Sequence, residues 1–248
     1  MSASGLLLVV VAGAALAYVT AALRAGRWSA WRTASWLSAC LLIAVALSPP
    51  LSGAGPRAHM AQHVLLGMLA PIGLVAAAPV TLLLRTLPPP RRRPVVRVLR
   101  ARPVRVLGHP ATAAVLDVGG LYLLLLTPVA AAAHHAEWAA FGVHVHYLAA
   151  GYLFTWSIAG PDPAPGRPGL RTRLAVFVLA AGAHSVLAKL LYARASGHHH
   201  DAHLNQEAAQ LMYYGGDLAE VLLAVLLFAT WYRRRARHRP RRTPAASG

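Results

Sequence analysis

The chain has 248 residues, of which 57% are apolar and 12% are charged, and its mean hydropathy is +0.50. This composition is typical of an integral membrane protein and argues against a soluble all-α protein with buried helices. The formal net charge is +17, from 24 basic and 7 acidic residues. The positions of the charged residues decide whether this basic excess reflects membrane topology or nucleic-acid binding.

Seven apolar segments are long enough, or nearly so, to cross a bilayer as helices, which requires about 20 residues. They comprise residues 5–23, 34–51, 62–87, 111–133, 138–159, 172–193 and 207–232. The connections between them are short apart from residues 88–110. The sequence therefore predicts an all-α membrane bundle of about seven transmembrane helices, with residues 1–248 forming one domain.

The basic residues predict the orientation of this bundle. With the N-terminus outside, the inner connections and the C-terminal tail hold 21 of the 24 basic residues, as the positive-inside rule expects. These are Arg24, Arg27 and Arg32, then those from Arg85 to Arg105, from Arg167 to Arg173 and from Arg233 to Arg242. We therefore interpret the charge as topology and contact with membrane lipids, and expect no nucleic-acid binding. Residues 232–248 are expected to form a basic cytoplasmic tail.

A helix-spaced pair of histidines lies at the start of the third apolar segment. His59 and His63 are four residues apart and share one helix face, which lets two imidazoles bind one metal ion; two interfacial polar residues would have the same spacing. Met60 is a possible further ligand. Pro71 removes a helical hydrogen bond and predicts a kink near mid-membrane. The single cysteine, Cys40, leaves no thiolate pair, so a metal site here would use histidine, methionine or carboxylate.

The inner connection 88–110 alternates arginine with valine and leucine, which predicts a short amphipathic helix on the cytoplasmic leaflet. The fourth segment then carries Asp117 inside the membrane. A buried ionisable group is costly there and indicates a functional or pairing role.

Histidines and carboxylates continue along the last three segments. In the fifth, His144 and His146 point to different faces, and we expect His144 to face the interior because small residues continue its face. The sixth segment places His184 deep in the bundle, and in the seventh Asp217 and Glu220 share a face. The preceding outer loop contains a histidine-rich tract that predicts loose metal capture: His198, His199, His200 and His203.

All histidines except His109 and His238 lie on the predicted outer side or in the outer to central part of the segments. Histidine is the commonest metal ligand in proteins. This bias predicts a metal or proton pathway that opens outward.

An ordered series of short motifs adds a resemblance. The motifs are His59-Met60-Ala61-Gln62-His63, Pro71, Ala78-Pro79-Val80-Thr81-Leu82, Val143-His144-Val145-His146-Tyr147, Gly160-Pro161-Asp162-Pro163, Ala183-His184 and Gly215-Gly216-Asp217. Over about two thirds of its length, the chain resembles the CtaG-type cytochrome c oxidase assembly factors of bacteria. Leu126-Thr127-Pro128 departs from that pattern, because many relatives have a Trp-His pair there.

The resemblance implies a multi-pass protein of the bacterial plasma membrane that helps to mature a haem–copper oxidase. It further implies that the protein supplies or inserts copper, with oxidase subunits as its partners. The family's polar positions fall on His59, His63, His144, His184 and Asp217.

We therefore expect the outer tract to capture copper, His59 and His63 to receive it, and His144 and His184 to hold it. Asp217 would be a ligand or would orient one, and Met60, His146 and Glu220 are possible further ligands.

Three other functions remain open from the sequence. A metal or proton transporter would use the intramembrane charges of Asp117, Lys189, Asp217 and Glu220. A haem-binding electron carrier would use paired histidines as iron ligands. A metal-free assembly scaffold would use its histidines only for packing. An enzyme is not expected, because the chain has no nucleophile elbow, phosphate-binding glycine loop or carboxylate pair placed for acid–base catalysis.

Overall fold

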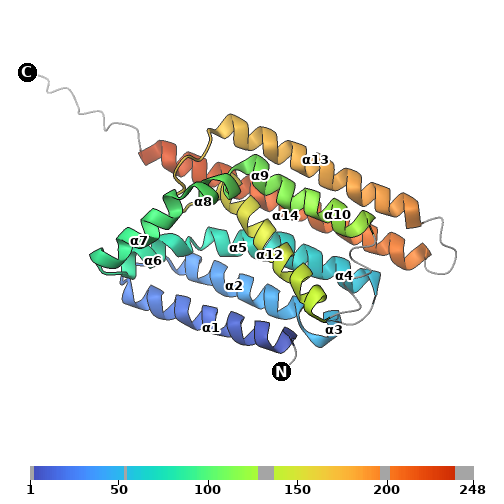
Figure 1. Ribbon diagram of the computed structural model, residues 1–248, viewed down its shortest axis with the longest axis horizontal. Helices are drawn as coiled ribbons and strands as arrows, with labels where there is room; N and C mark the ends of the chain where they lie inside the picture. Colours follow the sequence, from blue (N-terminus) through green and yellow to red (C-terminus); the bar gives the residue numbers. More distant parts are fainter. Residues whose placement is uncertain (1–2, 53–54, 128–136, 196–201, 238–248) are drawn as a thin grey trace, which may run out of the picture.

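The computed structural model describes residues 3–52, 55–127, 137–195 and 202–237, and helices are the only regular secondary structure in these residues (Figure 1). Most helices run along one long axis, and each predicted apolar segment corresponds to a helix or to a broken helix. The continuous helices are α1 (Ala3–Arg24), α2 (Ala30–Ala46), α12 (Glu137–Ala159), α13 (Leu170–Ala195) and α14 (Ala202–Arg237).

Four helical stretches in the described residues are long and apolar enough to cross a membrane. These are Gly5–Arg24, Pro56–Thr86, Leu170–Ala195 and Ala202–Ala236. The apolar helices Ala30–Ala46 and Pro110–Leu126 are shorter. The crossings by these shorter helices and by α12 therefore stay a prediction.

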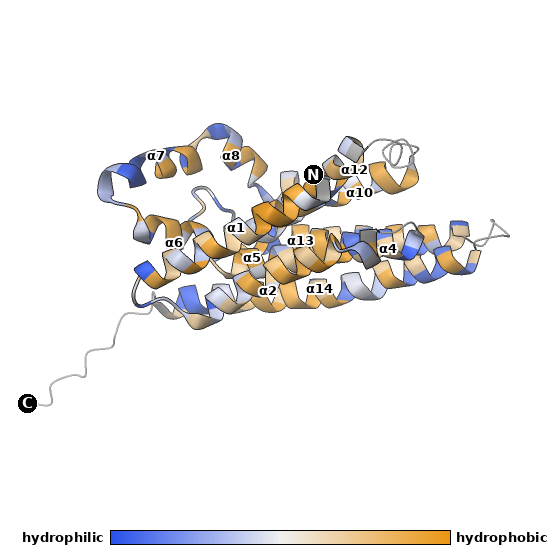
Figure 2. Cartoon of the chain, turned by 90° about the horizontal axis from the view of Figure 1, so that it is seen from below, coloured by the Kyte–Doolittle hydropathy of each residue, from blue (hydrophilic) through white to orange (hydrophobic). Residues whose placement is uncertain are grey.

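The side chains are distributed as expected for a bundle surrounded by lipid. Large apolar residues such as Val9, Leu16 and Leu179 are exposed on the outside, whereas Ala39 and Ala70 are completely buried between helices. Small residues at helix interfaces allow the close approach on which packing in membranes depends. Figure 2 shows the apolar colouring running along the sides of the bundle.

The second apolar segment forms a shorter helix than predicted. Residues 34–51 were expected to be continuous, but α2 ends at Ala46 and a separate short helix, α3 (Pro49–Ser52), follows. The two consecutive prolines at 49 and 50 cannot donate the backbone hydrogen bonds that would continue α2. The helix α2 therefore ends before the two prolines, at Ala46.

The third and fourth segments are broken helices, and each contains a π-helical stretch. The third comprises α4 (Pro56–His63), the π-helix η1 (Val64–Leu69), α5 (Ala70–Ala76) and α6 (Pro79–Thr86). The fourth comprises α9 (Pro110–Ala114), the π-helix η2 (Val115–Gly119) and α10 (Gly120–Leu126). A π-helical turn holds one more residue than an α-helical turn and is frequently found at functional sites.

Pro71 was expected to kink the third segment, and the distortion there takes the form of η1, which ends two residues before it. The helix is interrupted further on, where Ala78 has a left-handed backbone with φ of 55° and Pro79 begins α6. The hydroxyl of Tyr18 donates a hydrogen bond to the carbonyl of Ala77 at this break, with an O···O distance of 2.8 Å. Proline is favoured at the first turn of a helix, which explains where α6 starts.

The start of α6 is held by a side chain from a distant part of the chain. Asp162, which follows α12 and is completely buried, accepts hydrogen bonds from the backbone N–H of Val80 at 3.2 Å and of Thr81 at 2.7 Å. The Thr81 hydroxyl donates to the same carboxylate at 2.6 Å. A carboxylate at this position satisfies orphan N–H groups and interacts favourably with the helix dipole.

Arginine side chains cap the C-terminal end of α12 nearby. Arg173 donates to the carbonyl of Ile158 at the end of α12, at 2.8 Å, and Arg167 and Arg234 both donate to the carbonyl of Gly160, the residue that follows α12. Burial lowers the pKa of Arg167 to about 10, which leaves its guanidinium charged at neutral pH. Positive charge at a helix C-terminus is stabilising.

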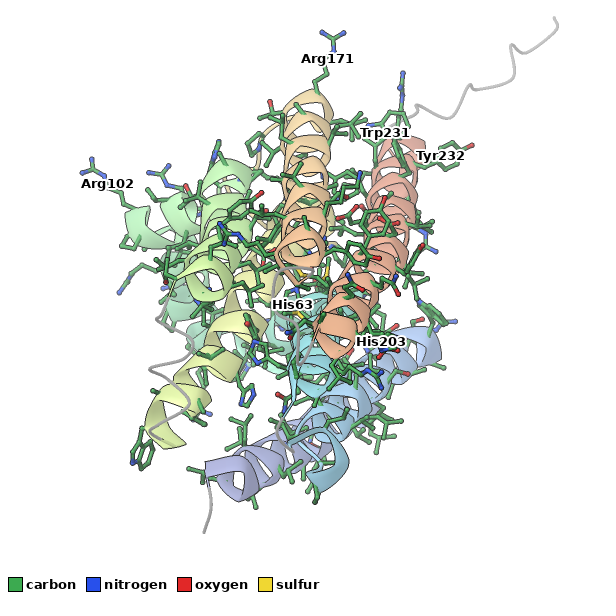
Figure 3. The ribbon with its side chains drawn as sticks, turned by 90° about the vertical axis from the view of Figure 1, so that its right-hand side faces the viewer. His63, Arg102, Arg171, His203, Trp231 and Tyr232 are labelled. Carbon is green, nitrogen blue, oxygen red and sulfur yellow. The ribbon has the colours of Figure 1, made fainter. Side chains whose placement is uncertain are left out.

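The arginine-rich connection forms the two helices α7 (Pro89–Arg100) and α8 (Arg102–Leu107), in place of one predicted helix. Figure 2 shows them standing away from the bundle, and their arginines are exposed. The break between them falls at Ala101, which has an extended backbone, and Pro103 lies in the first turn of α8. Side chains such as Arg102 and Arg171 point outward (Figure 3).

Gly151 of α12 lies at a close approach between α12 and the third segment. A Cβ atom added there would overlap the carbonyl oxygen of Gly67 in η1 and would lie 3.1 Å from Pro71. Because a backbone atom cannot move aside easily, we expect Gly151→Ala to lower the free energy of unfolding by about 1–3 kcal/mol. Thermal unfolding in detergent measures this loss.

The matched control is Gly142→Ala, on the same helix, where an added Cβ meets nothing within 4 Å. It is expected to be neutral or slightly stabilising, because alanine has the higher helix propensity. Equal stability of the two variants would contradict the close packing at Gly151.

Candidate functional site

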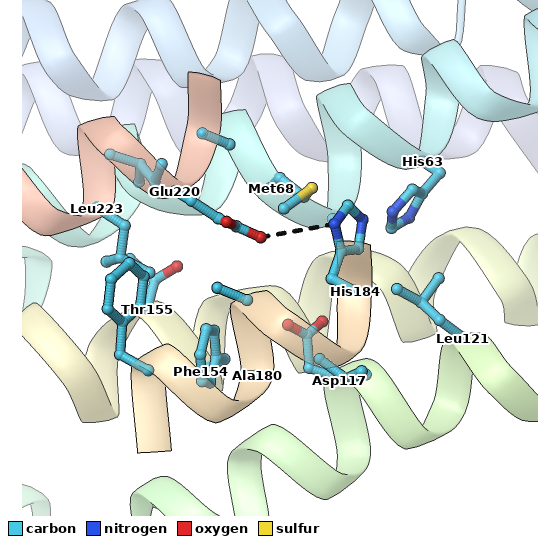
Figure 4. A pocket seen from close by; sticks show the side chains of 16 residues that line it. His63, Met68, Asp117, Leu121, Phe154, Thr155, Ala180, His184, Glu220 and Leu223 are labelled. Atoms are coloured by element: carbon cyan, nitrogen blue, oxygen red, sulfur yellow. Dashed lines mark ion pairs between the residues drawn. The ribbon is translucent and has the colours of Figure 1, made fainter. Parts of the chain in front are cut away.

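A cavity of about 40 Å³ lies inside the bundle, where the two π-helical stretches meet α12, α13 and α14 (Figure 4). Most of its wall is apolar. Its polar and sulfur-containing lining residues come from five parts of the chain: His63, Met68, Asp117, Thr155, His184 and Glu220. A volume of this size is sufficient for an ion or a few water molecules.

His63 and His184 are the central pair of this cavity. The two residues are 1% and 3% exposed, and the centres of their rings are 6.0 Å apart. Among the described residues, neither ring nitrogen of His63 has a hydrogen-bond partner, and neither does Nε2 of His184. Buried polar atoms are nearly always hydrogen-bonded, so three unpartnered imidazole nitrogens beside one cavity indicate a place for a ligand.

Glu220 orients the second of these rings. Its Oε1 lies 3.5 Å from Nδ1 of His184. Figure 4 shows Glu220 on one side of the His184 ring and His63 on the other, so that Nε2 is the nitrogen turned toward His63. A carboxylate bound to the far nitrogen is the usual support of a metal-ligating histidine.

Glycines create the space that the two rings occupy. A Cβ added at Gly216 of α14 would overlap the imidazole of His184, and one added at Gly67 would lie 3.2 Å from Nδ1 of His63. The glycines allow the helices to approach closely around the rings.

The predicted shared face of His59 and His63 is confirmed, and Tyr147 of α12 lies against it. The Tyr147 ring packs edge-on against both imidazoles, with ring-centre distances of 6.1 Å to His59 and 5.0 Å to His63. Its hydroxyl is 3.2 Å from Nε2 of His59. Tyr147 is 2% exposed and was not among the predicted site residues.

The other two histidines of α12 face different neighbours. Nε2 of His144 lies 3.3 Å from Oε1 of Gln62, and His144 lines an apolar groove that includes Leu7 of α1. His146 packs against Gly120 of α10, where an added Cβ would overlap its ring. The α12 side chain that contacts His63 is therefore Tyr147, and His144 does not line the cavity at His184.

The remaining candidates lie on α4 and α14. Asp217 is half-buried on α14 and does not line the cavity, whereas Glu220 one turn further on does. Met60 is buried in the apolar core. His203 is exposed and lies 3.4 Å from Glu207, which also pairs with Arg57. Three predicted residues lie outside the described part of the chain: His198, His199 and His200.

The predicted ligands consequently do not come together as one set. Within residues 3–52, 55–127, 137–195 and 202–237, no group of three or more histidine, cysteine, aspartate or glutamate side chains could hold a metal ion. What the fold does bring together is the His63–His184 pair, with Glu220 behind one ring and Met68 and Asp117 in the same cavity.

The chain is similar to known sequences over most of its length. Residues 15–234 match the family described as cytochrome c oxidase caa3 assembly factor (Caa3_CtaG). Over 182 residues, or 67% of this chain, it is 34% identical to uncharacterized proteins of Mycobacterium bovis and Mycobacterium tuberculosis. Over 155 residues, or 58% of this chain, it is 33% identical to one from Mycobacterium leprae. These regions are 26% and 24% of the relatives' lengths, so the chain spans about a quarter of each. No solved structure matches it.

Proposed function

Since the chain belongs to the Caa3_CtaG family of cytochrome c oxidase caa3 assembly factors, we propose that it binds copper and delivers it to a haem–copper oxidase during assembly. Copper is the cargo in this proposal, and the role is that of a carrier without catalytic activity. The partners are oxidase subunits, and the location is the bacterial plasma membrane, which the chain crosses seven times.

The observation that carries this proposal is the buried His63–His184 pair with its unpartnered nitrogens. A metal ion lies about 2.0 Å from an imidazole nitrogen, so two rings that share one ion between facing nitrogens have centres about 6 Å apart. The measured separation of 6.0 Å is of this size. Imidazole is a suitable ligand for copper, and the absence of thiolate favours a site that can release its ion.

The arrangement of charge supports an outward-facing route to this pair. The arginine-rich helices α7 and α8 and the start of α13 belong to the end expected inside the cell, and His203 lies at the opposite end. From that outer end, the His198–His203 tract would capture copper and His59 would pass it inward along the face shared with His63. Asp217, next to the cavity, would add negative charge.

A second candidate, a metal or proton transporter, is favoured by the two carboxylates of the cavity, Asp117 and Glu220. Transport requires passage through the bundle, whereas delivery requires binding and release on one side. Metal flux into sealed proteoliposomes therefore separates the two functions: sustained flux supports a transporter, and saturable binding without flux supports a carrier.

Copper uptake by the purified full chain tests the proposal. We expect the wild-type protein to retain copper through gel filtration and the His63→Ala/His184→Ala variant to retain far less, because both buried imidazole donors are removed. Copper is quantified by elemental analysis against protein concentration, and circular dichroism checks that the variant is folded. Equal retention by the two proteins would sink the assignment of copper to this cavity.

A further inference from the structure

The thioether of Met68 stands beside the histidine pair at the same cavity. Met68 belongs to η1 and is half-buried, and Figure 4 shows its sulfur end turned toward the His184 ring. Neither the histidine spacing nor the motif series singled this residue out. It adds a soft sulfur donor to two imidazoles in a chain whose single cysteine, Cys40, is not among the residues lining this cavity.

The π-helical geometry of η1 explains why Met68 shares the cavity with His63. In an α-helix, residues five apart point about 140° away from one another, because each residue turns the helix by about 100°. In a π-helix the hydrogen bonds run five residues back, which brings residues five apart onto one face. The N–H of Ala70 donates to the carbonyl of Leu65 in this manner. The π-helical turn therefore places the Met68 sulfur at the cavity, whereas an α-helix would direct it to another face.

From this juxtaposition we infer that the site is built for monovalent copper, Cu(I), with Met68 as the third ligand beside His63 and His184. The inference rests on the proposed copper-carrier function and specifies its cargo. Thioether sulfur selects Cu(I) over the harder divalent ions. A single positive charge is also less costly to bury than a double charge in a cavity whose wall is mostly apolar.

The carboxylate nearest to the pair is consistent with this assignment. Glu220 faces Nδ1 of His184 and lies on the far side of that ring from His63. It is placed to fix the ring and its tautomer, and not to lie between the two imidazoles. Asp117, the other carboxylate of the cavity, is the oxygen donor that a Zn²⁺ or Cu²⁺ ion would use, so the two-ion comparison below decides between these ions and Cu(I).

The test measures the affinity of the full chain in detergent for two ions. Cu(I) is supplied without oxygen and in the presence of ascorbate, with bicinchoninic acid as the competing chelator, and Zn²⁺ is measured separately. We expect Cu(I) to bind more than about tenfold more tightly than Zn²⁺. Met68→Leu is expected to weaken Cu(I) binding by about tenfold or more, because loss of a direct ligand exceeds the effect of losing an outer partner. Its Zn²⁺ affinity should stay unchanged.

The matched control is Met212→Leu. Met212 is completely buried in the apolar core and does not line the cavity, so its replacement by leucine should leave both affinities unchanged. X-ray absorption of the copper-loaded wild-type protein provides a readout that is independent of how well Met68→Leu folds. The spectrum of the wild-type protein should contain a copper–sulfur scattering shell, and that of Met68→Leu should lack it.

Three results would overturn the inference: equal affinity for Zn²⁺ and Cu(I), no copper–sulfur shell in the wild type, or the same Cu(I) affinity in Met68→Leu as in the wild type. Each of these leaves copper carriage by the histidine pair intact, provided that His63→Ala/His184→Ala still loses copper. A wild-type protein that binds no copper in either oxidation state would instead remove the proposed function, and the inference with it.

Discussion

Cells whose only copy of this protein carries His63→Ala/His184→Ala are expected to mature no more active caa3-type oxidase than cells that lack the protein. The two alanines remove the imidazoles whose ring centres are 6.0 Å apart, and among the described residues no other histidine lines the cavity. In the proposed function, copper then has no buried site from which it can be delivered. Oxidase activity in membranes and the copper content of the purified oxidase measure the effect.

The control for this experiment is His109→Asn. His109 is exposed at the start of α9, on the arginine-rich end, and its Nδ1 accepts a hydrogen bond from the N–H of Ala111 as a helix cap. Asparagine is also a good N-cap, so this variant should mature the oxidase normally. Immunoblots establish that all variants reach the membrane. Normal oxidase activity with the double variant at wild-type abundance would show that delivery does not use this pair.

Asp162→Ala is expected to lower the free energy of unfolding by roughly 5 kcal/mol, the largest stability loss that we predict for one residue. The change removes three hydrogen bonds to a buried carboxylate, and hydrogen bonds to charged groups are worth about 1.5–3 kcal/mol each. It also leaves the first N–H groups of α6 without their cap. Thermal or denaturant unfolding in detergent measures the loss.

Two further substitutions divide this effect into its parts. Asp162→Asn should lose about half as much, because its amide oxygen can still accept from Thr81 while its NH₂ group faces the N–H of Val80. Thr81→Ser keeps the hydroxyl donor and should be close to wild type. If Asp162→Ala were no less stable than Thr81→Ser, the carboxylate would not be holding α6.

The helices could be predicted from the sequence better than their interruptions. Apolar runs long enough for a bilayer predicted the long helical segments of the described residues, because in lipid the backbone has few alternatives to a helix. The end of α2 follows from Pro49 and Pro50, whereas the break at Ala78 is held by a contact with a distant part of the chain. The carbonyl of Ala77 is bonded to Tyr18, from the first helix, and such a long-range contact leaves no periodic signal in the sequence.

The candidate site was predicted in part. The spacing of His59 and His63 was sufficient to place both on one face, and His184 was expected deep in the bundle, where it lies beside His63. His144 was expected to face inward because small residues continue its face, but the buried face of α12 runs through Tyr147, Gly151, Phe154 and Ile158. The regular spacing of these bulky and small residues was the signal that would have identified Tyr147.

Glu220 and Met68 show why the rest of the site could not be predicted. Glu220 was a possible ligand because it shares a face with Asp217, but only the packing of α13 on α14 determines which of the two meets His184. Met68 is placed by a π-helical turn, and counting at the α-helical period assigns it to the wrong face.

The extra residue in each π-helical turn also has a consequence for comparing this chain with others. A relative that is one residue shorter between His63 and Pro71 can form an ordinary α-helix there, and its alignment with this chain then needs a single-residue gap. The position of that gap decides which side chain is taken as the counterpart of Met68. The same holds around Asp117 in η2. A gap placed at a loop, where insertions are usually tolerated, would pair residues that point to opposite sides of the helix.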